Sequence, residues 1–305
     1  MNAPSTASPP TPPPSAGALA PDGTEPGPRR TTLRRFLRHR LAVVGLFVLV
    51  ALAVGCFGAD WVAPYPRNAQ DVLLGATPPS GAHWLGTDQL GRDYLSEVLY
   101  AGRISLAIGL SVAVLSTAVG TVLGGLAGYL GGWAEEWTMR VTDLFLVVPA
   151  IAVLALAIQG LGSSPVTIVL VLTALGWTLI ARVVRAQVLS LREKEYIDAA
   201  RVLGVSDLRI LWRHLLPNLL GVIVVNVSLS VAGAVILEST LSFLGFGVQP
   251  PRSSWGNMLS QASGMVGTSQ SYLLYAPGAA ILLTVLAVNF VGDGLRDAFD
   301  PQGRH

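Results

Sequence analysis

Charged residues are scarce in this sequence. Only 12% of its 305 residues are Asp, Glu, Lys or Arg, whereas 51% are hydrophobic. A soluble domain usually carries about 25% charged residues, so the composition argues for a membrane protein with several spanning segments. The net charge of +2 is too small to indicate a nucleic-acid partner.

Cysteine is also nearly absent. Cys56 is the only cysteine, so no disulfide can form within the chain. The four histidines, His39, His83, His214 and His305, are scattered, and no two of them have the spacing of metal ligands. The sequence therefore predicts no metal site, no catalytic triad and no cofactor bound by this chain.

Cys56 allows two interpretations. The Arg-rich stretch 29–40, the apolar run after it and the small residues at 52–56 follow the order of a lipoprotein signal with an acylated cysteine. However, the apolar segments that follow need no lipid anchor, and a long polar leader is a poor start for such a signal. We therefore favour a first spanning helix that contains a cysteine.

Long apolar runs predict the membrane-spanning helices. A helix rises 1.5 Å per residue, so about 20 residues cross the hydrocarbon layer of roughly 30 Å. We expect an all-α polytopic membrane protein with six transmembrane helices. Pro149 and Pro277 should kink or loosen two of them and leave carbonyl groups that neighbouring protein or water must satisfy. The predicted spans are 41–59, 104–130, 141–160, 165–183, 219–240 and 273–291.

The chain divides into three predicted parts. Residues 1–28 contain nine prolines and predict a disordered leader. Residues 29–103 combine an Arg-rich anchor, which should attract anionic membrane lipid, with the first transmembrane helix and an extracytoplasmic segment. Residues 104–302 form the transmembrane core, which includes a polar loop at 186–218.

Positive charges are distributed unevenly between the connecting segments. If the N-terminus lies inside the cell, the inner segments carry sixteen of the twenty Lys and Arg residues. Because positive residues concentrate on the cytoplasmic side of membrane proteins, both termini and the polar loop are expected in the cytosol. The four outer residues are Arg67, Arg92, Arg103 and Arg252.

Glycines recur every four residues along the second span. Gly120, Gly124, Gly128 and Gly132 would fall on one face of a helix and let another backbone approach closely. We interpret this face as a helix-packing surface rather than a ligand site.

The polar loop has the pattern of a surface helix followed by a tight turn. Apolar residues alternate with charges over 186–203, as in an amphipathic helix. Gly204 is a helix stop, and Ser206 or Asp207 can cap a second short helix. The turn Leu203-Gly204-Val205 should protrude with apolar shoulders, a shape that can insert into a cleft on a partner protein.

This loop resembles the EAA loop of ABC importer permeases. The family pattern is Glu-Ala-Ala, three residues, Gly, nine residues and Ile-x-Leu-Pro. Here Asp198-Ala199-Ala200 is followed by three residues, Gly204, nine residues and His214-Leu215-Leu216-Pro217. Asp198 keeps the carboxylate of the family Glu, whereas His214 replaces Ile and places a polar side chain on the docking side.

Three further stretches, residues 83–96, 238–259 and 292–301, resemble the C-type permease of the dipeptide, oligopeptide and nickel importers. The resemblance covers about residues 30–302 and implies a type I ABC importer permease fold, with N and C termini cytoplasmic. It implies four partners: a homologous permease subunit, two cytosolic ATPase subunits that use ATP and Mg, and an extracytoplasmic solute-binding protein. The ATPases would bind the docking loop at Asp198, Ala199, Ala200, Leu203, Gly204, Val205, Leu216 and Pro217.

The implied function is that of an integral permease subunit in a prokaryotic plasma membrane, forming half of a pathway for peptides or a related small solute. Nickel chelates, opines and sugar-like solutes stay open, because selectivity lies largely in the binding protein. The sequence has no Gly-x-x-x-x-Gly-Lys-Ser/Thr phosphate loop, so the chain should not be an ATPase itself. Two alternatives remain. A secondary transporter would need coupling carboxylates within the spans or an inverted repeat, and neither is evident. The second alternative is a membrane scaffold without a pathway.

Polar residues near the outer ends of the spans allow two interpretations. Asp88, Arg92, Asp93, Glu97 and Arg103 could form an outer gate or a surface for a delivery protein. They could equally form local pairs, each worth under about 1 kcal/mol. Glu238 lies near the outer end of the fifth span, where an unpaired carboxylate is costly, so it should have a structural partner or face the pathway.

Overall fold

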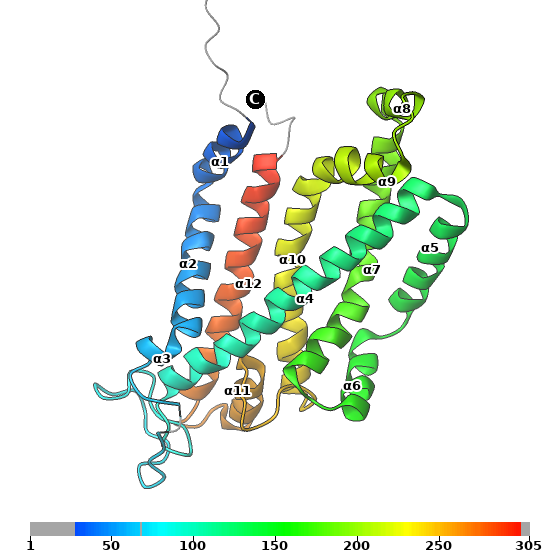
Figure 1. The fold of residues 1–305 in the computed structure, drawn as a ribbon. Helices are drawn as coiled ribbons and strands as arrows, with labels where there is room; N and C mark the ends of the chain where they lie inside the picture. The colour runs from blue at the N-terminus through cyan, green and yellow to red at the C-terminus, as the bar shows by residue number, and fades with distance from the viewer. Residues whose placement is uncertain (1–27, 68, 300–305) are drawn as a thin grey trace, which may run out of the picture.

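The computed structural model describes residues 28–67 and 69–299, and these residues form helices without any strand (Figure 1). The expected leader, residues 1–28, lies outside the described residues except for Pro28. The long helices are α2 (Arg40–Phe57), α4 (Tyr94–Leu130), α7 (Pro165–Arg192), α10 (Leu216–Phe243) and α12 (Tyr272–Phe299). The shorter helices are α1 (Pro28–Arg38), α3 (Ala59–Val62), α5 (Gly132–Val147), α6 (Ala150–Leu161), α8 (Glu195–Val202), α9 (Asp207–Ile210) and α11 (Trp255–Ala262).

Five helices in the described part are long and apolar enough to cross a membrane, and a sixth span results if α5 and α6 are taken together. These two helices are bent by 89° relative to each other. The bend lies at Val148-Pro149, where proline has no N–H to continue the helical hydrogen bonds. The predicted interruption at Pro149 is confirmed, whereas α12 continues through Pro277 as one helix.

Several helix boundaries differ from the prediction; for example, α5 begins at Gly132 instead of 141 and α12 ends at Phe299 instead of 291. α4 begins at Tyr94 instead of 104, because the Asp93 carboxylate caps it and accepts a hydrogen bond of 2.9 Å from the Ser96 N–H. At 1.5 Å per residue its 37 residues measure about 55 Å, and the helix crosses the bundle obliquely (Figure 1). α7 continues to Arg192 instead of ending at 183.

Glycines bring α4 and α7 into close contact. A Cβ atom at Gly120 would lie 2.7 Å from the Trp177 carbonyl oxygen, and one at Gly128 would lie 2.9 Å from the Arg185 carbonyl oxygen. Real side chains do not approach so closely, so these positions require glycine. The predicted packing face does not include Gly132. α4 ends at Leu130, and Gly132 begins α5 with nothing within 4 Å of its added Cβ.

Cys56 lies in α2 with its side chain buried. It packs with Trp255 of α11 and with Tyr94 at the start of α4. A buried cysteine that packs against α4 and α11 suits the interpretation as a residue of the first spanning helix.

The short helices divide between the two ends of the bundle. α1, α8 and α9 lie at one end, together with the C-terminal end of α12, whereas α3 and α11 lie at the other (Figure 1). His39 and Asp297 approach to 3.7 Å at the first end, where Phe36 and Ala298 pack together. The Arg-rich segment and the polar loop therefore share one end of the molecule.

Candidate functional site

The polar loop presents a sharply defined turn after α8. Gly204 has φ +74°, which an L-residue with a side chain rarely adopts. The Gly204 N–H donates to the Arg201 carbonyl at 2.9 Å, and the Val205 N–H donates to the Ala200 carbonyl at 3.1 Å. These two bonds form a Schellman motif, and the predicted helix stop at Gly204 is confirmed.

The crest of this turn is apolar and exposed. Val202 and Leu203 are 88% and 82% exposed, and no atom lies within 4 Å of a Cβ added at Gly204. Leu208 and Trp212 extend the exposed apolar surface along the following helix. Contiguous exposed apolar side chains indicate a surface for another protein.

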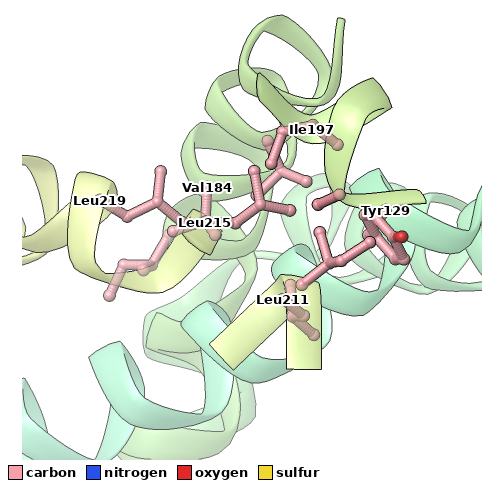
Figure 2. Close-up of a cluster of buried hydrophobic side chains, with 10 residues drawn as sticks. Tyr129, Val184, Ile197, Leu211, Leu215 and Leu219 are labelled. Atoms are coloured by element: carbon pink, nitrogen blue, oxygen red, sulfur yellow. The ribbon is translucent and has the colours of Figure 1, made fainter. Parts of the chain in front are cut away.

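The base of the turn is a buried hydrophobic cluster (Figure 2). Ile197 of α8 is fully buried, and the adjoining cluster residues come from α4, α7, α10 and the turn before α10. Burial of one such side chain stabilises a protein by about 1.5–3 kcal/mol. The exposed turn is therefore fixed to the ends of the long helices. The other labelled members are Tyr129, Val184, Leu211, Leu215 and Leu219.

Polar contacts hold the two sides of the loop together. The Tyr129 hydroxyl donates a hydrogen bond of 2.6 Å to Asp207, and Arg201 lies over the Tyr129 ring at 5.5 Å from its centre. Arg201 also donates to Asp198 at 3.1 Å. Ser206 precedes α9 without a capping bond from its side chain, and Asp207 pairs with Tyr129.

The loop helix predicted over 186–203 is divided between two helices. α7 ends at Arg192, and α8 starts at Glu195 after a short turn. On the other side of the turn, α9 continues into α10 through one π-helical turn, Leu211–Leu215. Pro217 supplies no N–H at this junction, while the side-chain amide of Asn218 donates to the His214 carbonyl at 2.6 Å.

This continuity joins the polar loop to a candidate membrane span. Asp207–Phe243 forms one helix of 37 residues that carries the turn at one end. The predicted docking residues Asp198 to Val205 lie together on the exposed element, with Ala200 facing the buried cluster. Leu216 and Pro217 lie apart from them, at the start of α10.

An apolar groove opens beside the loop, between α4 and α10. Its volume is about 560 Å³, and Leu208, Leu211 and Trp212 form one end of its wall. Thr117 and Thr121 line it, and their hydroxyl oxygens are buried without a hydrogen-bond partner among the described residues. Sequence reasoning missed this groove, because it arises where two helices diverge and no local pattern marks it.

The predicted outer residues form local pairs at the opposite end. Arg92 contacts Asp88 at 2.6 Å and Glu97 at 3.3 Å, and His83 contacts Asp93 at 2.9 Å. Three of the predicted outer residues, Asp88, Arg92 and Glu97, line one pocket.

Arg103 lies away from that pocket. It contacts Asp60 at 2.8 Å and donates to the Phe57 carbonyl at 3.2 Å, so it holds the turn between α2 and α3. The hydrogen bond from Arg103 holds the pKa of Asp60 below its ordinary value.

Glu238 is fully buried and is held by serine hydroxyls. Ser105 donates to its carboxylate at 3.1 Å and Ser242 at 2.7 Å, while Ser254 donates to the Ser242 hydroxyl at 3.2 Å. Ser105 in turn accepts a hydrogen bond of 3.1 Å from the main-chain N–H of Trp255. Glu238 therefore joins α4, α10 and the start of α11, and its partners among the described residues are hydroxyl groups instead of a cation.

The chain is similar to known transport proteins over most of its length. Residues 120–305 match the family described as the inner membrane component of binding-protein-dependent transport systems, and residues 27–79 match the N-terminal TM domain of oligopeptide transport permease C. A Brucella suis biovar 1 protein named as a peptide permease is 41% identical over 277 residues, which cover 90% of this chain and 92% of the relative. The oligopeptide transport system permease protein OppC of Mycobacterium bovis is 39% identical over 284 residues, covering 92% and 97% of the two chains.

Proposed function

Because this chain belongs to the family of inner membrane components of binding-protein-dependent transport systems, and is thus a multi-pass permease of a bacterial ABC transporter, we propose that it forms half of the pathway of an ATP-driven peptide importer. Peptides are the favoured cargo because the relatives are named as peptide and oligopeptide permeases. Nickel chelates, opines and sugar-like solutes have no comparable support.

One observation carries the coupling part of this proposal. The exposed apolar turn rests on a buried cluster and continues through α9 into the span α10. A cytosolic ATPase that binds Leu203, Gly204 and Val205 would therefore act directly on a transmembrane helix. Closure of two ATPases on ATP and Mg would move this turn and the equivalent turn of the partner permease, and the pathway would alternate between its two openings.

The surface of the spans supports a partner permease. In α4, the most buried candidate span, 44% of the 18-residue apolar stretch is buried inside this chain. In α2 the buried share is 17%. The remaining surface must face lipid or protein. The apolar groove between α4 and α10 is part of this surface, and in the proposed pair a helix of the second permease would cover it.

The remaining partners follow from the family. The sequence has no phosphate-binding loop of the P-loop type, so separate subunits would hydrolyse ATP. A binding protein would deliver cargo at the end that carries α3 and α11, since the docking turn at the other end would face the cytosol.

The test uses the complete transporter in proteoliposomes. Gly204→Val places a β-branched side chain at φ +74° on the exposed crest, and we expect it to abolish ATP-driven peptide uptake and cargo-stimulated ATPase activity. Gly162→Val is the matched control, since Gly162 is also an open glycine at a helix end, with φ +86°. Membrane insertion should be normal in both variants. Wild-type uptake by Gly204→Val would contradict the docking assignment.

A further inference from the structure

A pocket of about 380 Å³ lies at the end of the molecule opposite the docking turn. It is formed by the start of α4, by α11 and by the start of α12. Three charged side chains, Asp88, Arg92 and Glu97, line it together with apolar residues. Because the docking end would face the cytosol, this pocket would face the side from which cargo arrives.

The two carboxylates share one guanidinium unequally. Asp88 accepts the Arg92 Nε–H at 2.7 Å with one oxygen, and with the other it accepts the main-chain N–H groups of Leu90 and Arg92, each at 2.9 Å. Glu97 has only the longer contact of 3.3 Å to Arg92 and makes no hydrogen bond with the residues that the structure describes. The side chain of Glu97 is nevertheless only 4% exposed.

Glu97 therefore lacks a hydrogen-bond donor among the described residues, and the two cations near it, Arg92 and Arg67, act on it through their charge. A buried carboxylate is stable only when it is both paired and hydrogen-bonded, and Arg92 is already engaged by Asp88. A primary ammonium group carries a positive charge and three N–H donors. Such a group would complete the coordination of Glu97.

The wall of the pocket suits variable apolar groups. Met258 and Met265, two of the four methionines in the chain, line it beside Leu273. Methionine side chains are flexible and polarisable, so a methionine wall adapts to ligands of different shape. The pocket thus combines a fixed site for a cation with an adaptable apolar surface.

We propose that this pocket receives the N-terminal residue of a peptide cargo, with Glu97 accepting hydrogen bonds from the α-ammonium group and with Met258 and Met265 against the first side chain. Every peptide with a free amino terminus shares the ammonium group, while its first side chain varies. This inference rests on the proposed peptide-import function and adds the part of the cargo that the permease recognises.

The first test compares two cargo peptides in proteoliposomes that contain the complete transporter. One tripeptide has a free amino terminus and the other is N-acetylated, and both are supplied on the binding protein below saturation. Glu97→Gln should lower the initial uptake rate of the free-amine peptide about tenfold, as expected for the loss of a charge-assisted hydrogen bond, and should leave uptake of the acetylated peptide unchanged.

The matched control is Glu136→Gln. Glu136 lies in α5 and makes an exposed ion pair of 2.5 Å with Arg140. It does not line the pocket, so this variant should import both peptides at the wild-type rate. Equal uptake of the free-amine peptide by Glu97→Gln and wild type would overturn the proposed site. ATP-driven uptake by the wild type would still support the proposed import function.

A loss of equal size for both peptides would also overturn it, because Glu97 would then serve the fold or the contact with the binding protein. Absence of ATP-driven uptake in the wild type would instead contradict the proposed function itself.

A second measurement needs no variant. A tripeptide with photo-leucine at its first position should crosslink to Met258 or Met265 in the wild-type transporter, and mass spectrometry that finds adducts only elsewhere would reject the site.

Discussion

The hydroxyl group of Tyr94 donates a hydrogen bond of 2.5 Å to the main-chain carbonyl oxygen of Leu273. In a regular helix that carbonyl would accept the N–H of residue 277, but Pro277 has none. The first residue of α4 therefore supplies the donor that α12 lacks. The prediction that a neighbouring group must satisfy the carbonyl freed by Pro277 is confirmed by this contact.

Tyr94→Phe should decrease the free energy of unfolding by about 1–3 kcal/mol, because it leaves a buried carbonyl without a donor. Unfolding of the detergent-solubilised protein in denaturant measures this change. The informative comparison is made in a Pro277→Ala background, where the helix regains its own N–H. There the effect of Tyr94→Phe should shrink to a few tenths of a kcal/mol, and an undiminished effect would show that the hydroxyl has another role.

Gly124→Ala should separate α4 from α7. A Cβ at this position would lie 2.8 Å from the Cα of Ala181, a main-chain atom that cannot move aside. We expect a loss of about 1–3 kcal/mol in the free energy of unfolding. Gly233→Ala in α10 is the control, since nothing lies within 4 Å of its added Cβ, and there alanine should stabilise the helix by up to about 1 kcal/mol. The same sign for both variants would contradict the packing argument.

Substitutions at the base of the docking turn should affect stability, whereas substitutions at its crest should affect binding of the ATPase subunits. Ile197→Ala removes a fully buried side chain and should cost about 2–4 kcal/mol of stability. Leu203→Ala on the exposed crest should change stability by less than about 0.5 kcal/mol, while reducing copurification of the ATPase subunits. Normal ATPase binding by Leu203→Ala would remove the crest from the proposed interface.

The pair of Arg103 and Asp60 predicts a pH dependence. Arg103 lowers the pKa of Asp60 in the folded protein, so the pair contributes stability above the unfolded-state pKa of Asp60. This contribution is lost as the pH falls through the lower folded-state value. Asp60→Asn should therefore reduce stability at neutral pH but not at the acid end of the titration. Thermal unfolding measured across acidic pH checks this, and a pH-independent difference would contradict it.

Local signals in the sequence account for much of the fold. The apolar runs locate the long helices, Pro149 marks the interruption between α5 and α6, and Gly204 marks the end of α8. Each of these features depends on one residue type or on a continuous pattern. The four-residue glycine repeat failed at Gly132, because Gly131 and Gly132 both adopt positive φ and end α4 before the repeat is complete.

Contacts between distant segments could not be predicted in the same way. Spacing predicts an ion pair between Asp143 and Arg140, yet Asp143 pairs with Arg182 of α7, and Arg140 pairs with Glu136. The pocket near Glu97 joins segments that are more than 150 residues apart. Nothing in the local sequence of Glu97 distinguishes it from a surface carboxylate, and only the packing of α11 and α12 encloses it.

The long helix that begins at Asp207 crosses α4 where Gly109 faces Val235, with a Cβ at Gly109 only 2.6 Å from the Val235 side chain. In the proposed importer this tight crossing would act as a pivot. A push by an ATPase on the arm of the helix that carries the docking turn would tilt its far arm, to which Glu238 and its serines attach α11. The two openings of the proposed pathway would then change shape together.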